Sequence, residues 1–248
     1  MSAKGSQQNR PSRRRQDPHT TTQDAGEKRA AKSPRSFGRK KAGEREYAGP
    51  LLPKSAKTGK LLHSEESYKG HVFSVWTDTV LEPGATKPYT RDVVRHNGSV
   101  VVLAVDDRTN PADPEVMLIR QYRHAAGQYL LELPAGRIDV GEKPLAAAKR
   151  EMIEETGFRA KRWTPLVRYF ASPGFLGEWM QIFLAEHLVA GAATPEEDER
   201  IDLVPTPLSR ALEMVLAGKI HDGKTLIGLS VLDARRRRDR NGLATESR

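Results

Sequence analysis

The 23 residues from Gly136 to Phe158, GRIDVGEKPLAAAKREMIEETGF, constrain the fold of this chain more than any other stretch. The segment beginning at Pro144 has a helical composition and gathers Glu151, Glu154 and Glu155 near its end. Residues three and four apart share one helical face, so these carboxylates crowd together. Each like-charge pair costs about 0.2–0.5 kcal/mol on an exposed helix, and the negative end of the helix dipole adds a similar penalty. The pattern therefore predicts that a positive group, such as a hard divalent cation, binds this face.

The segments around this stretch predict an α+β fold in which a mixed sheet packs against a helix. The apolar, β-branched run SVVVLAVD is typical of a buried strand. EVMLIRQYR, QYLLELPAG, TPLVRYF and WMQIFLAEHL predict further strands, and PLSRALEMVLAG and KTLIGLSVLDARRRR predict helices. HVFSVWTDTVL and YTRDVVRH predict a small extra sheet, which either folds over the core or pairs with another subunit.

Four regions are expected along the chain. Residues 1–50 hold few large apolar side chains, so burial cannot offset the entropy of ordering them, and we expect a disordered basic tail. Residues 51–97 form a linker and a small antiparallel sheet, residues 98–233 form the main domain, and residues 234–248 form a basic C-terminal tail. The tails carry the net positive charge of +9. A solvated tail is favoured over a nucleic-acid site because no aromatic stacking platform accompanies the charge.

Composition excludes several classes of protein. No cysteine is present, which excludes disulfides and thiolate metal sites. The mean hydropathy is −0.62, and neither a signal peptide nor a membrane-spanning run is visible. The histidines are scattered, without a pair at metal-ligand spacing. We therefore expect a cytoplasmic protein with no membrane partner and at most weak nucleic-acid contact through its tails.

The acidic stretch follows a recognisable order. Gly136 is followed by Glu142, then by Arg150 and the three glutamates, and then by Gly157 and an apolar residue. This order resembles the Nudix box, the signature of the Nudix hydrolases, which cleave a diphosphate linked to another group. The resemblance implies a Nudix-type α/β/α sandwich with a mixed sheet and a small N-terminal antiparallel sheet. It also implies Mg²⁺ as the cofactor, with Mn²⁺ as an alternative.

The resemblance also assigns roles within the box. Glu151, Glu154 and Glu155 match the family's metal ligands, and the carbonyl of Ala135 resembles a backbone ligand used in one branch. Metal ions neutralise the phosphates and lower the pKa of a bound water. The remaining box positions are expected to be structural: two glycines suit a tight loop and a helix end, and a carboxylate with an arginine holds the ligands in place. These positions are Gly136, Glu142, Arg150 and Gly157.

Three flanking features resemble the ADP-ribose pyrophosphatase branch. Pro173 lies sixteen residues beyond Gly157, within SPGFLGE. RQYRHAAGQYLLELPAG resembles the branch's approach to the box, and KTLIGLSVL resembles its C-terminal helix. The resemblance runs from about Tyr68 to Leu232 and leaves both tails outside.

The branch suggests further site residues. Arg123 matches a residue that contacts substrate phosphate or ribose, and an arginine fork suits phosphate oxygens. Glu132 matches a residue near the substrate, and Arg91 an arginine that reaches substrate from the N-terminal sheet. Glu178 is a candidate general base. A box carboxylate, Glu154 or Glu155, is the alternative base, and the sequence leaves this choice open.

The sequence therefore predicts a metal-dependent enzyme that hydrolyses ADP-ribose to AMP and ribose 5-phosphate, acting as a homodimer. Another nucleoside diphosphate sugar is an alternative substrate. A different class, a non-catalytic nucleotide sensor that binds nucleic acid through basic tails, is also open, although an intact acidic box argues against it. An RNA 5′-end pyrophosphohydrolase is a third alternative, which the SPGFLGE loop disfavours.

Overall fold

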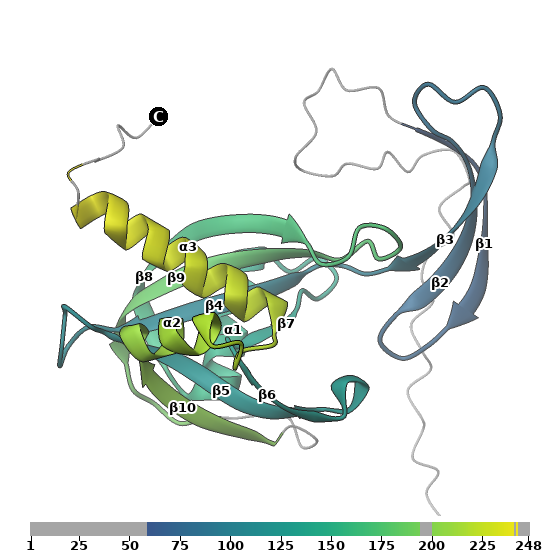
Figure 1. The fold of residues 1–248 in the computed structure, drawn as a ribbon. Helices are drawn as coiled ribbons and strands as arrows, with labels where there is room; N and C mark the ends of the chain where they lie inside the picture. Colours follow the sequence, from purple (N-terminus) through teal and green to yellow (C-terminus); the bar gives the residue numbers. More distant parts are fainter. Residues whose placement is uncertain (1–58, 194–199, 241, 243–248) are drawn as a thin grey trace, which may run out of the picture. The chain divides into compact units, whose positions relative to one another are not determined.

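The computed structural model describes residues 59–193, 200–240 and 242, which form a mixed sheet, three α-helices, a short 3-10 helix (His124–Ala126) and a smaller separate sheet (Figure 1). The predicted tail over residues 1–50 lies outside the described residues. The main sheet has seven strands in the order β10-β5-β4-β9-β8, with β6 paired to β5 and β7 paired to β4. Its strands are β4 (Ser99–Asp106), β5 (Glu115–Arg123), β6 (Gln128–Glu132), β7 (Ala135–Arg137), β8 (Arg159–Phe170), β9 (Trp179–Val189) and β10 (Ile201–Pro207).

Strand β4 lies at the centre of this sheet and is buried over its whole length. It pairs parallel with β9 and antiparallel with β5 and β7, so the sheet is mixed. Successive side chains of a strand point to opposite faces. Val100, Val102 and Ala104 pack on one face with Ala148 and Met152 of helix α1 (Pro144–Thr156). The continuous apolar run predicted for this strand reflects helices on both sides of it.

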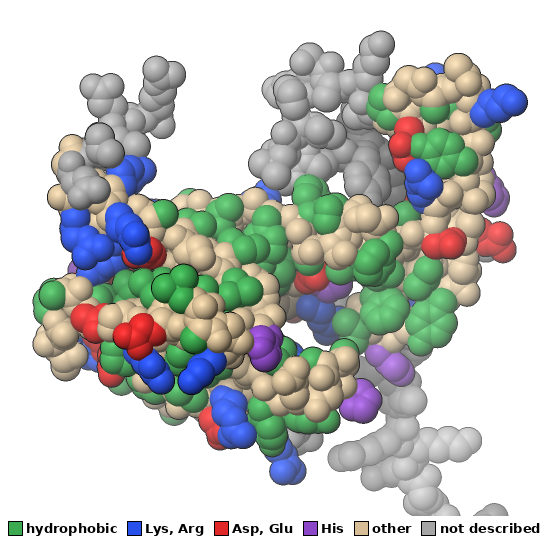
Figure 2. Space-filling model, in the orientation of Figure 1, with side chains coloured by type: hydrophobic (Ala, Val, Ile, Leu, Met, Phe, Trp, Pro, Cys, Tyr) green, Lys and Arg blue, Asp and Glu red, His purple; other side chains and the backbone are tan. Residues whose placement is uncertain are grey.

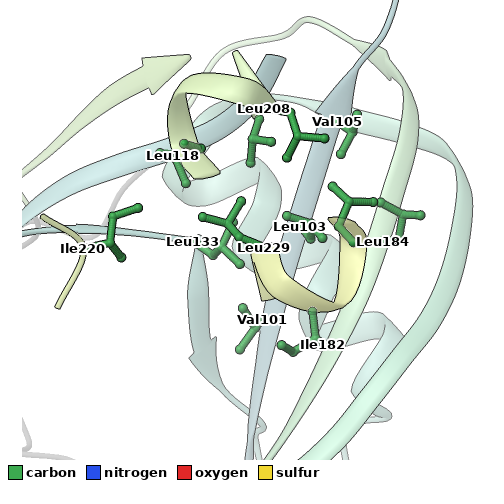
Figure 3. Close-up of a cluster of buried hydrophobic side chains, with 13 residues drawn as sticks. Val101, Leu103, Val105, Leu118, Leu133, Ile182, Leu184, Leu208, Ile220 and Leu229 are labelled. Carbon is green, nitrogen blue, oxygen red and sulfur yellow. The ribbon is translucent and has the colours of Figure 1, made fainter. Parts of the chain in front are cut away.

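The opposite face of the sheet is covered by helices α2 (Leu208–Leu216) and α3 (Gly223–Arg240). Leu208 and Leu229 pack there with Val101, Leu103 and Leu184 from the sheet (Figure 3). Helix α1 on one face and α2 with α3 on the other make an α/β/α sandwich. The predicted fold class is confirmed.

The small sheet has the order β1-β2-β3 and is antiparallel, as predicted. Its strands are β1 (Lys60–Lys69), β2 (Ser74–Leu81) and β3 (Tyr89–Arg95). Beyond its pairing with β2, β3 bonds to the loop before β9: the Val94 N–H donates to the Phe175 carbonyl at 2.8 Å, and the Gly177 N–H donates to the Val94 carbonyl at 2.9 Å. The SPGFLGE loop is thereby tied to the end of β3.

Two strands differ from the sequence expectations. Strand β1 was not predicted, because its side chains are mostly exposed and give no alternating pattern. Strand β10 was not predicted either, because it contains two prolines; it lies at the edge of the sheet and pairs with β5. Helix α3, predicted over residues 224–238, spans Gly223–Arg240, and the domain boundary at residue 233 stays a prediction. No helix in the described part of the chain is long and apolar enough to cross a membrane.

Candidate active site

Helix α1 carries the acidic residues, and its two ends are defined by the sequence. Pro144 occupies its first turn, where the missing N–H leaves no bond unmade. Gly157 ends it with φ 75°, a left-handed conformation that suits glycine, and donates its N–H to the Ile153 carbonyl at 2.9 Å. Ala147, Ala148 and Met152 are buried against the sheet. This packing fixes the rotation of α1 and so the direction of its glutamates.

Arg150 joins the carboxylates of the box. Its Nη1 donates to Oε1 of Glu151 at 2.7 Å and to Oε2 of Glu154 at 2.9 Å. Its Nε donates to Oε1 of Glu142 at 3.2 Å, and its Nη2 donates to the Arg137 carbonyl at 3.0 Å. One guanidinium therefore supplies part of the positive charge that the crowded carboxylates require. It also ties the acidic helix to strand β7 and the loop after it.

The charge state of Arg150 follows from these contacts. Partial burial of the side chain works to lower its pKa, but the hydrogen bond to Glu142 and the attraction of Glu151 outweigh it and raise the pKa above its ordinary value. The guanidinium is thus permanently charged. Glu142 in turn has its pKa held below the ordinary range, first by the Arg150 hydrogen bond.

Close backbone contacts hold the two buried glutamates of the helix. A Cβ on Gly136 would lie 2.0 Å from the carboxylate carbon of Glu151, so only glycine leaves room for that carboxylate. The Ala135 N–H donates to Oε2 of Glu155 at 2.9 Å. Strand β7 therefore lies directly against the acidic helix. The metal role of the Ala135 carbonyl stays a prediction.

Glu178 lies at the end of the SPGFLGE loop, beside the first residue of β4. The Ser99 hydroxyl donates to Oε1 of Glu178 at 2.5 Å. Ser99 pairs with Arg137 of β7, and the Arg137 carbonyl accepts a hydrogen bond from Arg150. Glu178 is therefore connected to the box through Ser99 and strand β7. His96 Nδ1 is 3.7 Å from Glu178 but accepts the Gly98 N–H at 3.1 Å, so it has no proton to donate.

The protonation of His96 agrees with this geometry. Burial lowers the pKa of the imidazole more than the nearby Glu178 carboxylate raises it, and Arg137 lowers it further. His96 is therefore a neutral neighbour of Glu178, and the hydroxyl of Ser99 is the donor that fixes the carboxylate.

Arg123 and Glu132 form a bidentate pair across the β5–β6 hairpin. Arg123 Nε and Nη2 each donate to Glu132 at 2.8 Å, and Glu132 is almost completely buried. Lys224 donates its Nζ to the same carboxylate and, at 3.0 Å, to Asp222 Oδ1. Asp222 accepts the N–H of Thr225 at 2.9 Å and so caps helix α3.

Pairing overrides burial in the titration of this cluster. Burial alone would raise the pKa of Glu132, but the hydrogen bond from Arg123 and the charge of Lys224 lower it below the ordinary value. The pKa of Arg123 is raised, first by its hydrogen bond to Glu132. Both groups are charged at neutral pH.

The remaining predicted residues lie away from the box contacts described above. Pro173 belongs to a turn in which the Ser172 carbonyl accepts the Leu176 N–H at 2.9 Å, and the loop closes through the Ala171 N–H to the Glu178 carbonyl at 3.0 Å. Arg91 lies in the small sheet, 3.5 Å from Glu82 and 4.3 Å from the Tyr89 ring centroid. Its contact with substrate stays a prediction.

Comparison with known proteins decides the family. A model described as the NUDIX domain matches residues 95–223, which begins at the end of β3 and ends at the start of α3. The chain belongs to the Nudix family. The resemblance stated for the acidic stretch is thereby confirmed.

Two curated relatives are similar to this chain in sequence, and one solved structure is similar to it in fold. An ADP-ribose pyrophosphatase of Bacillus subtilis is 33% identical over 175 residues, covering 70% of this chain and 91% of that protein. A GDP-mannose pyrophosphatase of Citrobacter koseri is 37% identical over 163 residues, covering 58% of this chain and 84% of that protein. A crystal structure of an ADP compounds hydrolase superposes with a TM-score of 0.62 at 23% identity, covering 77% of this chain and all of that one, which shows the shared fold. Family and relatives together identify a Nudix diphosphatase, and the prediction of an enzyme is confirmed.

Nudix hydrolases in general use divalent metal ions, and the donors on α1 suit one. The donors are all carboxylate oxygens, which hard cations prefer. The negative charges of Glu142 and the three candidate ligands exceed the single positive charge of Arg150, so the face stays negative and attracts a cation. Within residues 59–193, 200–240 and 242, however, no group of three or more acidic or histidine side chains is arranged to hold a metal. The donor set fits in chemistry and charge, and the exact ligand set stays a prediction.

Sequence reasoning missed three residues of this Nudix site: Ser99, Asp222 and Lys224. Ser99 gave no signal, because it lies at the start of an otherwise apolar strand and its partner is far along the chain. Asp222 carried a weak signal, since an aspartate directly before Gly223 has the residue type that caps a helix, whereas Lys224 carried none.

Proposed function

We propose that this Nudix protein is a metal-dependent hydrolase that cleaves the diphosphate of ADP-ribose to AMP and ribose 5-phosphate. One observation carries the proposal: Arg150 gathers Glu142, Glu151 and Glu154 of a complete box on one side of α1. The relative named ADP-ribose pyrophosphatase supports the choice of substrate.

Glu151, Glu154 and Glu155, with the Ala135 carbonyl, would hold Mg²⁺. When bound, the ion would neutralise the diphosphate and lower the pKa of a coordinated water. The protein's own part is to hold these carboxylates in place through Arg150, Gly136 and the Ala135 N–H.

The chain's other residues act on substrate and water. Arg123 donates from Nε and Nη2 to Glu132, and its side chain is 39% exposed. Its third nitrogen, Nη1, is then the one that donates to the substrate phosphates. Glu178, held by Ser99, orients the attacking water and accepts its proton as the water oxygen bonds to one phosphorus. The bond from that phosphorus to the bridging oxygen breaks, and AMP and ribose 5-phosphate leave.

GDP-mannose or another nucleoside diphosphate sugar is the alternative substrate, because a GDP-mannose pyrophosphatase is also a close relative. All these molecules share the diphosphate that the box addresses. They differ in base and sugar, so the discrimination lies outside the box.

A substrate panel tests the proposal. We expect kcat/KM with Mg²⁺ to be highest for ADP-ribose among ADP-ribose, ADP-glucose, GDP-mannose and UDP-glucose, with Mn²⁺ measured alongside. A higher value for GDP-mannose would move the enzyme to the alternative. No hydrolysis of any member, together with salt-dependent DNA binding, would support the nucleotide sensor instead. Figure 2 shows where that sensor would have positive charge, over the C-terminal end of α3.

We also propose that the enzyme is a cytoplasmic homodimer that pairs through the small sheet β1–β3. Exposed Tyr68, Val72 and Phe73 at the turn between β1 and β2 support this, because such groups gain by burial. Sedimentation at micromolar concentration should give twice the mass of the chain. A monomeric mass there would contradict the dimer.

A further inference from the structure

The buried side of Glu132 contains a second cation whose role the proposed reaction does not use. Lys224, the second residue of α3, has a side chain that is only 9% exposed, and its Nζ contacts the carboxylate that also binds Arg123. Burying a lysine costs desolvation, so a lysine is rarely buried unless it is paired. A bidentate arginine already pairs with Glu132, and a second cation is more than that carboxylate needs to be satisfied.

The charge balance indicates what the second cation does. Arg123 and Glu132 alone would form a neutral pair with little attraction left for phosphate. Lys224 offsets the charge of Asp222, so Arg123, Glu132, Lys224 and Asp222 sum to zero. Without Lys224 the remaining three side chains would be net negative and would repel a diphosphate. The other oxygen of Asp222 accepts the Thr225 N–H and hydroxyl at the positive end of the α3 dipole, which fixes Asp222 beside Lys224.

The same contacts fix geometry as well as charge. Thr225 Oγ1 accepts the N–H of Leu133, the residue after Glu132, at 2.7 Å. Thus the first turn of α3 holds both the side chain of Glu132 and the backbone beside it. The direction of the Arg123 guanidinium depends on this carboxylate, through two parallel bonds.

We propose that Lys224, fixed by Asp222, is a positioning residue that orients Arg123 for the substrate diphosphate through their shared partner Glu132 and keeps the cluster from becoming net negative. This inference rests on the proposed function, because it takes Arg123 as the phosphate-binding residue. Lys224 itself does not touch substrate in this account.

A double-mutant cycle tests it, with kcat and KM measured for ADP-ribose at saturating Mg²⁺. Lys224→Met keeps much of the side chain's length and apolar stem and removes the charge; we expect KM to rise about tenfold with kcat nearly unchanged, since Arg123 holds substrate and transition state alike. In an Arg123→Met background, Lys224→Met should have little further effect, because the residue acts through Arg123. Lys224→Arg should recover most of the lost affinity.

The outcomes separate this inference from the proposed function. Equal fold-losses from Lys224→Met in both backgrounds would overturn the positioning role and indicate a structural one. If Lys224→Met does not fold, the cycle is run with Lys224→Gln, which also removes the charge, and equal losses in both backgrounds again overturn the role. If Arg123→Met hydrolyses ADP-ribose as well as the wild type, the proposed role of Arg123 fails first.

Discussion

At the scale of single residues, the site depends on close contacts around the carboxylates of the box. Arg150 donates to three carboxylates and a backbone carbonyl, which explains how α1 tolerates its acidic face in the folded chain. Gly136 is needed because the Glu151 carboxylate occupies the space of a Cβ. The box spacing predicted the helix and its acidic face, but it could not predict that Glu151 packs onto Gly136.

Gly136→Ala should therefore displace the Glu151 carboxylate, since the added carbon would lie 2.0 Å from it. We expect kcat/KM for ADP-ribose to fall by about tenfold or more, with a shift to higher Mg²⁺ requirement. Gly59→Ala is the matched control, because its Cβ would make ordinary contacts of 3.4 Å and beyond. Equal activity and equal Mg²⁺ requirement in both variants would contradict the packing argument.

At the scale of elements, the first turn of α3 is as important to the site as α1. Its Thr225 caps the helix with Asp222 and accepts the buried Leu133 N–H, so the strand leading into the box is anchored from the opposite face of the sheet. The sequence predicted α3 from its apolar pattern. It could not predict this anchor, because hydrogen bonds between residues far apart in the chain leave no periodic signal.

Thr225→Val tests the anchor with almost no change in shape. The variant leaves the buried Leu133 N–H unpaired, and such a loss costs about 1–3 kcal/mol of unfolding free energy. Urea unfolding followed by circular dichroism measures the loss. Ser230→Ala, exposed on the same helix, serves as the control and should change stability by less than about 0.5 kcal/mol. The anchor would be wrong if both variants were equally stable.

At the scale of the whole molecule, the α/β/α sandwich brings three distant segments to one end of β4. The box lies on α1 and β7, Glu178 on the loop before β9, and the Arg123 cluster on β5, β6 and α3. The fold class and the box could be predicted because both depend on patterns within short segments: the apolar patterns of strands and helices, and the spacing of the box residues. The edge strand β10 and the exposed strand β1 could not, because pairing with neighbours, rather than their own residues, makes them strands.

Acid should weaken the whole fold in part through Glu132. Its folded-state pKa lies below the ordinary value of about 4.3, so the folded protein binds fewer protons there than the unfolded chain. The stabilisation is complete above that ordinary value and is lost as the pH falls through the lowered pKa. Unfolding free energy measured between pH 7 and pH 3 should therefore drop more steeply in the wild type than in Glu132→Gln. Parallel curves would show that Glu132 contributes nothing to the acid response.

The central claim is that the acidic face of α1 becomes a working site when it holds a divalent ion. Its most direct test is Mg²⁺-dependent turnover of ADP-ribose by Glu155→Gln beside the wild type, with thermal unfolding confirming that both are folded. Loss of a group that places the ion should lower kcat by at least about 100-fold in the variant. Unchanged Mg²⁺-dependent turnover in folded Glu155→Gln would contradict the claim.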